Sequence, residues 1–322
     1  MKNLITGGAG FIGSHLAEHL LGLGEEVVVL DDLSTGSLRN LEHLSGRKGF
    51  TYHIGKVEDR GLLDKSLEGV DRVYHLAAAV GVRLIVEDPI RTIETNINAT
   101  QLVLERSTAL GKQVLLTSTS EVYGKGERLP FSEDADVVYG PTTQPRWSYA
   151  ISKAADEFLL LASHRHKGLH GVIVRLFNTV GPRQVGRYGM VIPRFMEQAL
   201  GGGPITVYGS GEQKRCFAHV LDIVGALVDL MNCERADGEV VNLGSEEEVS
   251  INELAKRVRA MANPRAEIVR IPYEEAYGKG FEDMNARRPS LKKALSLIGF
   301  RTKRDLETIL RDVTEYARRK QG

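Results

Sequence analysis

A glycine-rich segment near the start of the chain constrains its fold more than any other feature. The segment reads Gly7-Gly8-Ala9-Gly10-Phe11-Ile12-Gly13, and it lies between an apolar run at residues 3–5 and a helical pattern at residues 11–23. Glycine at positions 7, 10 and 13 permits a tight turn, close approach of the backbone to phosphate, and close packing of helix on sheet. The N–H groups at the start of the helix favour a pyrophosphate. The segment therefore predicts a dinucleotide site.

The first half of the chain alternates short apolar runs with helical patterns. The runs are almost free of polar residues, as in parallel strands that are covered on both faces. We expect strands at residues 3–5, 26–30, 51–54, 73–76, 114–116 and 172–174, and helices at residues 11–23, 62–67, 89–110 and 147–165. A helix at residues 220–231 and a strand at residues 240–243 would return to the same sheet. The alternation predicts an α/β fold with a doubly wound parallel sheet.

The character of the chain changes after Arg175, where glycine and arginine become frequent. Such segments are typical of loops that face a substrate. We therefore expect a smaller C-terminal lobe that binds substrate. The predicted division places residues 1–177, with residues 216–245 returning to them, in the dinucleotide-binding domain. Residues 178–215 and 246–322 form the lobe.

Composition excludes several classes of partner. The 322 residues carry 42 Lys+Arg and 42 Asp+Glu, so the chain has no net charge to attract nucleic acid or an anionic membrane. The apolar stretch at residues 73–86 contains His75 and Arg83 and is too short to cross a bilayer. Cys216 and Cys233 are too few for a disulfide framework, so we expect reduced thiols in a cytoplasmic protein. His15 and His19 have metal-ligand spacing but no partner ligands, and we expect no metal site.

Two carboxylates predict which dinucleotide is bound. Asp31 and Asp32 end the second expected strand, 18 and 19 residues after Gly13. A carboxylate there accepts hydrogen bonds from ribose hydroxyls and repels a 2′-phosphate, which favours NAD over NADP. Arg39 lies nearby and could offer a partner to a phosphate, so NADP stays open as the alternative.

Tyr149 and Lys153 form the expected reaction centre. They are four residues apart on an expected helix and share a face. A phenol has a pKa of about 10, and a cation about 4 Å away contributes roughly 4 kcal/mol at an effective dielectric of about 20, enough to lower that pKa by about three. Tyr149 would then remove a proton from a sugar hydroxyl while its hydride moves to a nicotinamide. Thr119, in a hydroxyl-rich strand end, would hold that hydroxyl.

These motifs together resemble the extended short-chain dehydrogenase/reductases that modify nucleotide sugars, and the resemblance covers essentially the whole chain. It rests on residues 7–13, His75-Leu76-Ala77-Ala78, Asn96, Tyr149 with Lys153, residues 175–183 and residues 206–215. It implies a Rossmann-type sheet, NAD as the cofactor and a UDP-sugar as the substrate. The implied cofactor contacts are Gly7, Gly10, Phe11, Ile12, Gly13, Asp31, Asp32, Leu76, Ala77, Ala78, Tyr149 and Lys153. The implied substrate contacts are Val80, Ser120, Asn178, Arg187, Val207, Tyr208, Gln213 and Arg215, with Asn178 and Arg215 at the diphosphate and Tyr208 and Gln213 near the nucleoside.

Within the resembled family, the residues after Thr119 sort the chemistry. Dehydratases typically carry Thr-Asp-Glu, whereas this chain has Thr119-Ser120-Glu121, so dehydration is disfavoured. UDP-glucuronate decarboxylases typically keep Ser-Glu and a late arginine motif, which Arg287-Arg288-Pro289-Ser290 resembles. The resemblance implies conversion of UDP-glucuronic acid to UDP-xylose through a 4-keto intermediate, with Thr119, Glu121, Tyr149, Lys153 and Arg287 as catalytic residues. Arg287 would lie near the carboxylate, and Glu121 would orient the ring or move the proton at carbon 5.

Several alternatives stay open at this point. Glu121 could be a structural carboxylate that caps a turn, and Arg287 could be a surface residue at a helix start. A 4-epimerase acting on UDP-glucuronic acid or UDP-glucose would use the same Tyr149 and Lys153 chemistry. An NAD-sensing or scaffold protein on an inactive fold is disfavoured because Thr119, Tyr149 and Lys153 are all present. The long helices at residues 89–110 and 147–165 predict a homodimer with a four-helix interface.

Overall fold

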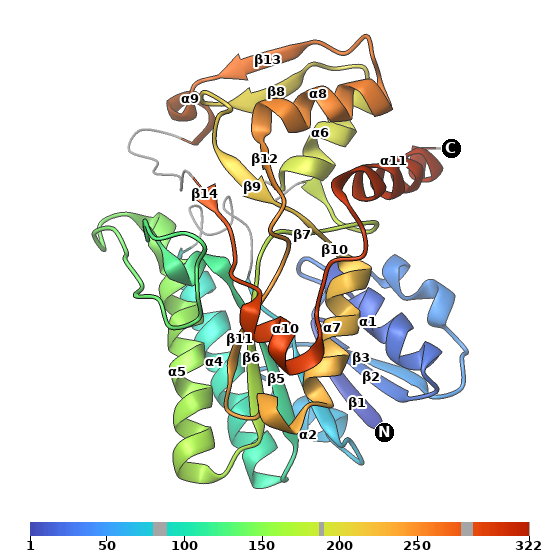
Figure 1. Ribbon diagram of the computed structural model, residues 1–322. Coiled ribbons are helices and arrows are strands. Elements are labelled where there is room, and N and C mark those ends of the chain that lie inside the picture. Colours follow the sequence, from blue (N-terminus) through green and yellow to red (C-terminus); the bar gives the residue numbers. More distant parts are fainter. Residues whose placement is uncertain (80–88, 187–189, 278–285, 322) are drawn as a thin grey trace.

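A seven-stranded parallel sheet forms the centre of the computed structural model, which describes residues 1–79, 89–186, 190–277 and 286–321 (Figure 1). The spatial order of its strands is β11-β6-β5-β4-β1-β2-β3. The strands are β1 (Lys2–Thr6), β2 (Glu26–Asp31), β3 (Phe50–Ile54), β4 (Arg72–His75), β5 (Gln113–Thr119), β6 (Gly171–Leu176) and β11 (Val240–Leu243). The strand order reverses between β1 and β4, and ligands of such sheets bind at the carboxyl ends of the strands at this reversal. The predicted α/β fold with a doubly wound sheet is confirmed.

Helices cover both faces of the sheet, as the near-continuous apolar strands require. One face carries α1 (Phe11–Gly22), α7 (Val220–Met231) and α10 (Lys292–Ile298), and the other carries α2 (Arg60–Ser66), α4 (Pro89–Ala109) and α5 (Ser148–Lys167). Every strand and helix expected in the first half of the chain is present, with ends that differ by at most three residues.

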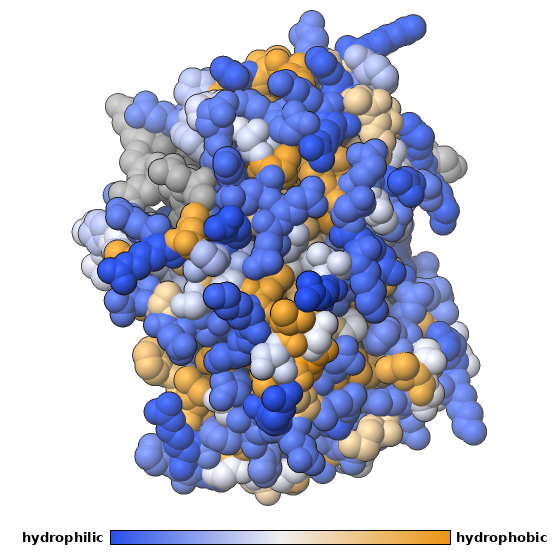
Figure 2. All heavy atoms as spheres, viewed as in Figure 1, coloured by the Kyte–Doolittle hydropathy of each residue, from blue (hydrophilic) through white to orange (hydrophobic). Residues whose placement is uncertain are grey.

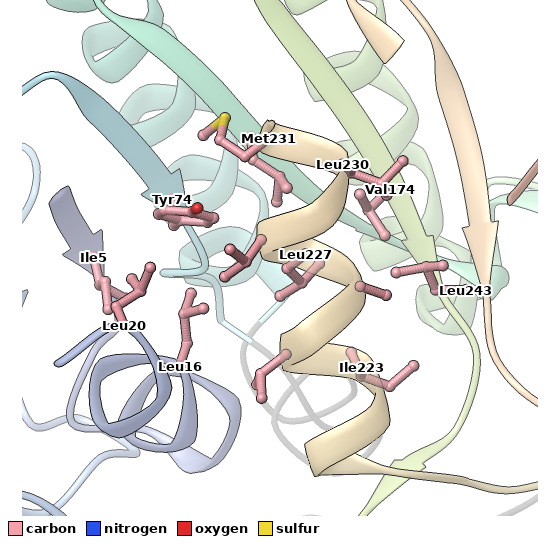
Figure 3. Close-up of a cluster of buried hydrophobic side chains, with 14 of the residues drawn as sticks. Ile5, Leu16, Leu20, Tyr74, Val174, Ile223, Leu227, Leu230, Met231 and Leu243 are labelled. Atoms are coloured by element: carbon pink, nitrogen blue, oxygen red, sulfur yellow. The ribbon is translucent and has the colours of Figure 1, made fainter. Parts of the chain in front are cut away.

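Figure 3 shows how the first face is packed. Leu16 and Leu20 of α1 and Leu227 of α7 lie against side chains of the strands, including Ile5 and Val174. All five are fully buried. Burying one such aliphatic side chain contributes about 1.5–3 kcal/mol. This packing fixes the start of α1, and with it the glycine-rich segment, beside the carboxyl end of β1.

A smaller lobe lies above the carboxyl ends of the strands in Figure 1. Its core joins α6, α8 and α11 through buried side chains such as Phe195, Leu254 and Leu310. Its elements are β7 (Thr179–Val180), α6 (Val191–Leu200), β8 (Ile205–Tyr208), β9 (Lys214–Cys216), β10 (Ala218–His219), β12 (Glu248–Ser250), α8 (Ile251–Ala262), β13 (Ile268–Ile271), α9 (Tyr273–Tyr277), β14 (Ala286–Arg287) and α11 (Leu306–Gln321). The predicted smaller C-terminal lobe is therefore present.

The expected boundary between the two domains stays a prediction. One segment assigned to the lobe from sequence, around α10, packs on the sheet instead. Leu291, Ala294 and Phe300 belong to the same buried cluster as α1 and α7. The chain thus leaves the lobe and returns to the sheet before α11.

The surface in the view of Figure 1 is mainly hydrophilic, with apolar side chains in smaller groups between the polar ones (Figure 2). Within the described ranges, no helix combines the length and the apolar character that a membrane crossing needs.

Candidate active site

A cavity of about 990 Å³ is lined by the carboxyl ends of the strands and by the lobe. The described residues that line it include most of those predicted from sequence. They are Gly7, Gly10, Phe11, Ile12, Gly13, Asp31, Asp32, Leu76, Ala77, Ala78, Thr119, Ser120, Glu121, Tyr149, Asn178, Tyr208, Gln213, Arg215 and Arg287. Lys153 and Val207 are buried and are not among the lining residues. Val80 and Arg187 lie outside the described residues.

The glycine-rich segment has the shape that a pyrophosphate requires. Gly7 has a φ of +73°, and a Cβ there would lie 2.8 Å from the backbone nitrogen of Ala77. A Cβ on Gly13 would lie 2.3 Å from the carbonyl oxygen of Gly7. Gly10 begins α1 without a side-chain cap, and no acidic residue occupies the first turn. Backbone N–H groups at this helix start therefore face the cavity, and no acidic residue of the first turn competes for them.

Asp31 both lines the cavity and holds the glycine-rich segment in place. Its carboxylate accepts hydrogen bonds from the backbone N–H of Ala9 at 2.9 Å and of Leu33 at 2.8 Å. Burial raises the pKa of Asp31. Asp32 is exposed, and its Oδ1 accepts a hydrogen bond from Ser34 N at 2.9 Å. The two carboxylates thus stand at the end of β2, where a ribose would lie if the pyrophosphate meets α1.

Tyr149 lies in the first turn of α5, and its side chain is buried. Burial raises its pKa above the ordinary value, the charge of Glu121 adds to the rise, and a hydrogen bond with Thr119 opposes it. Lys153, whose charge we expected to lower this pKa, donates from Nζ to Asp156 Oδ2 at 2.8 Å in a buried ion pair. We did not predict this partner from sequence.

A buried charge cluster of Glu121, Arg146 and Arg287 lies beside Tyr149 in the cavity wall. Arg146 Nη2 is 2.5 Å from Glu121 Oε2, and Arg287 Nη1 donates to Glu121 Oε1. Burial alone would raise the pKa of Glu121, but the charges of Arg287 and Arg146 outweigh it and lower the pKa to about 2. Glu121 is therefore ionised at neutral pH.

Neither Glu121 nor Arg287 has the position that its structural alternative requires. The Glu121 carboxylate pairs with two arginines and does not cap a turn, while Arg287 lies on β14 with its side chain 11% exposed. Arg146 was missed from sequence. One signal pointed to it: Arg146 precedes α5 directly, and a cation at a helix N-terminus opposes the helix dipole. Such a placement suggests a purpose other than helix stability.

The lobe supplies the opposite wall of the cavity. The guanidinium of Arg194 lies 3.8 Å from the ring centroid of Tyr208. Gln213 Nε2 donates to the Tyr208 carbonyl at 3.2 Å and to the Tyr273 hydroxyl at 2.8 Å. Arg194 and Tyr273 were missed from sequence because the lobe has no local motif that marks them. Val207 precedes Tyr208 on β8, and its side chain points into the core of the lobe, since successive side chains of a strand alternate.

Asn178 and Arg215 also reach the cavity, from separate strand ends. Asn178 Nδ2 donates to the Cys216 carbonyl at 3.0 Å. Arg215 is buried, and its Nη1 donates to the Lys214 carbonyl at 2.8 Å. Asn178 therefore contacts the strand that carries Arg215, and their roles at a diphosphate stay a prediction.

The fold and the site together define an α/β protein of the extended short-chain dehydrogenase/reductase type, which confirms the resemblance inferred from the motifs. The model of the family described as GDP-mannose 4,6 dehydratase matches residues 4–313, and the chain belongs to this family.

Two proteins of similar sequence and one solved structure of similar fold indicate which members of the family this chain resembles. The chain is 41% identical to the UDP-N-acetyl-alpha-D-glucosaminuronate decarboxylase of Bacillus cytotoxicus, over 98% of this chain and 97% of that protein. It is 37% identical to UDP-glucuronic acid decarboxylase 1 of Danio rerio, over 97% of this chain and 72% of that protein. Its fold is similar to the crystal structure of the UDP-glucuronic acid 4-epimerase of Bacillus cereus in complex with UDP-glucuronic acid and NAD. That likeness has a TM-score of 0.88, 28% identity and 99% coverage of each chain.

Proposed function

We propose that this protein is an NAD-dependent decarboxylase of a UDP-linked sugar acid, converting UDP-glucuronic acid to UDP-xylose through a 4-keto intermediate. The observation that carries the proposal is the ionised Glu121 held between Arg146 and Arg287 beside Tyr149. Two relatives that match almost the whole chain are named decarboxylases of UDP-linked uronic acids, which supports it.

The cofactor end of the cavity suits NAD. The N-terminus of α1 and Gly7, Gly10 and Gly13 would hold the pyrophosphate, and Asp31 and Asp32 would hold the adenosine ribose. When bound, NAD+ would accept the hydride of carbon 4 and, as NADH, give it back after carbon dioxide has left, so that the product is UDP-xylose; its positive nicotinamide ring would oppose the high pKa of Tyr149. The Bacillus cereus neighbour was solved with NAD, in line with this assignment.

Each residue of the reaction centre would have its own role in the reaction of the sugar. Tyr149 takes the proton from the carbon-4 hydroxyl, which Thr119 orients by hydrogen bonding. The resulting 4-ketone is beta to the carboxylate. The bond from carbon 5 to the carboxylate can then break, and its electrons pass into the ketone to form an enolate. Thr119 and the protonated Tyr149 stabilise the enolate oxygen. Arg287 would act near the carboxylate and carbon 5, and Glu121 would orient the ring or move the new proton at carbon 5.

The second candidate is a 4-epimerase for UDP-glucuronic acid or UDP-glucose, favoured by the fold likeness to the Bacillus cereus epimerase. It would share the Tyr149 step and would have to keep the carboxylate on the sugar. The Glu121 pair with Arg287 favours the decarboxylase, because UDP-glucuronate decarboxylases typically keep Ser-Glu and a late arginine, and here the two side chains meet in the cavity wall.

Proton NMR of the products decides between the two candidates. Purified protein is incubated with UDP-glucuronic acid, with and without added NAD+, and in parallel with UDP-N-acetylglucosaminuronic acid, the acid in the name of the Bacillus cytotoxicus relative. We expect UDP-xylose and bicarbonate from UDP-glucuronic acid. UDP-galacturonic acid with its carboxylate retained would overturn the decarboxylase proposal. We expect Glu121→Gln and Arg287→His to stop carbon dioxide release while NAD binding persists, and full release in both variants would overturn their roles.

The proposal extends to a homodimer in the cytoplasm. The helices α4 and α5 pack on each other and leave large apolar side chains outside, with Ile90 68% and Phe158 75% exposed. Apolar side chains exposed on a helix pair are typical of a subunit interface. Both cysteines are free, which is in line with a reducing compartment. A monomer by light scattering would contradict the dimer.

A further inference from the structure

Arg146 is the member of the charge cluster for which the proposed reaction has no assigned step. It lies in the 3-10 turn Pro145–Trp147, directly before α5, and three residues before Tyr149. Its side chain is 5% exposed, and it lines the cavity together with Thr119 and Tyr149. Any sugar that Tyr149 deprotonates therefore lies within reach of this guanidinium.

The guanidinium of Arg146 is only partly satisfied by the protein. Nη2 pairs with Glu121, but Nε and Nη1 are buried and have no hydrogen-bond partner among the described residues, whereas Arg287 has one such buried nitrogen, Nε. The ring of Trp147, 5.7 Å from the guanidinium, offers an apolar face and no acceptor. Unpaired N–H groups of a buried cation are costly, so their presence in a cavity wall indicates an acceptor that arrives with the ligand.

The charges of the cluster identify the kind of acceptor. Two guanidinium groups, of Arg146 and Arg287, stand against the single ionised carboxylate of Glu121, which leaves one net positive charge in a buried place. A neutral hydroxymethyl group would leave that charge unbalanced. A carboxylate on the ligand would neutralise it and accept the unused N–H groups, and guanidinium–carboxylate pairs are the preferred form of such contacts.

We propose that Arg146 binds the carboxylate of the sugar acid and decides that this cavity takes a uronic acid in preference to a neutral hexose. The inference rests on the proposed function, since it takes the substrate to be a UDP-linked sugar acid. Glu121 holds Arg146 and Arg287 in place from between them. Arg146 is thus the specificity-determining residue, while Arg287 and Glu121 act at carbon 5.

The test compares ligands with and without the carboxylate at carbon 6. Calorimetry with the NADH-loaded protein, which cannot oxidise carbon 4, measures the affinity for UDP-glucuronic acid, UDP-glucose and UDP in wild type and Arg146→Met. We expect the variant to lose roughly 10- to 100-fold in affinity for the acid, the range for one hydrogen-bonded charge, and less than about threefold for the other two ligands. An equal loss for all three ligands, or no loss for the acid, would overturn the proposal.

Two further variants control for folding and for long-range charge. Arg60→Met removes an exposed arginine that pairs with Glu105 on the surface, and we expect it to bind all three ligands as wild type does. If Arg146→Met does not fold, Arg146→Lys replaces it. A lysine has no planar guanidinium, so it cannot pair with Glu121 and bind the carboxylate of the ligand at the same time in the way that arginine does. We expect its preference for the acid over UDP-glucose to fall at least about threefold, and an unchanged preference would overturn the proposal.

A purely positioning role for Arg146 predicts a different pattern. If Arg146 acted only by holding Glu121, then Glu121→Gln would lose the preference for the acid just as Arg146→Met does, and the double variant would lose nothing more. We expect the opposite: Glu121→Gln keeps or gains affinity for the acid because it removes a competing negative charge, and Arg146→Met lowers that affinity in either background. These affinities do not depend on the product formed. A product of UDP-galacturonic acid would therefore end the decarboxylase proposal and leave the assignment of Arg146 standing.

Discussion

The two ends of the cavity are built in different ways. The pyrophosphate and ribose part of the cofactor end consists of a glycine turn, the start of α1 and two carboxylates at the end of β2, all within the first 32 residues. The sugar end is made of buried side-chain charges, where Glu121 and Arg287 meet across 166 positions of sequence. The first end recognises by shape and the helix dipole, and the second by charge that burial strengthens. A substitution at the sugar end should therefore lower turnover without weakening NAD binding, and a substitution at the cofactor end should weaken NAD binding.

The largest expected effect comes from Tyr149→Phe at the sugar end. Removing the proton acceptor should lower turnover about a hundred- to ten-thousandfold, the usual contribution of a general base. NAD binding, followed by calorimetry, should stay within about threefold, because the α1 contacts are untouched. Tyr52→Phe, an exposed residue of β3, is the control and should be fully active. Loss of NAD binding in step with turnover would show that the two ends are not separable.

Gly13→Ala damages the cofactor end. The added Cβ would meet backbone atoms of Gly7 and Gly8, which cannot move aside as a side chain can. We expect a loss of about 1–3 kcal/mol in the free energy of unfolding, the usual cost of overpacking, together with weaker NAD binding. Denaturant titrations with and without NAD measure both effects.

The same helix offers a matched control. Gly22 ends α1 with nothing within 4 Å of its added Cβ. Gly22→Ala should leave stability unchanged or raise it by up to about 0.5–1 kcal/mol, because alanine favours a helix. If both variants lost stability equally, the close packing at Gly13 would not be the cause.

The smallest effect is a pH dependence of stability that the charge cluster confers. The pKa of Glu121 is lowered to about 2 in the folded chain from an ordinary 4.5. Its contribution is therefore complete above the unfolded pKa and declines as the pH falls toward 2. By pH 4 wild type should lose about 1 kcal/mol more of its unfolding free energy, relative to pH 7, than Glu121→Gln loses. Equal losses in both proteins would mean that the arginines do not hold the pKa of Glu121 down.

The two ends also differ in how far they could be predicted from sequence. The glycine turn, Asp31, Asp32 and the order of strands and helices were predictable, because each depends on neighbours in the chain and on hydrophobic period. Thr119, Tyr149 and Glu121 were predicted from the hydroxyl-rich strand end, the Tyr-Lys spacing and the resemblance, and all three line the cavity. The ion pair of Lys153 with Asp156 joins residues three apart on one helix, so its spacing was visible in the sequence although we did not predict it.

By itself, the sequence determined the doubly wound sheet and the dinucleotide end of the cavity, since these follow from local turns and from apolar periodicity, and the resemblance of its motifs indicated the family. Only the tertiary structure decided the sugar end. Arg146 precedes one helix, Glu121 follows β5 and Arg287 lies on β14, and nothing in their spacing brings them together. Folding brings all three together in one cavity wall, where low polarity strengthens their mutual attraction. Nε and Nη1 of Arg146 have no partner among the described residues and can donate hydrogen bonds to a ligand.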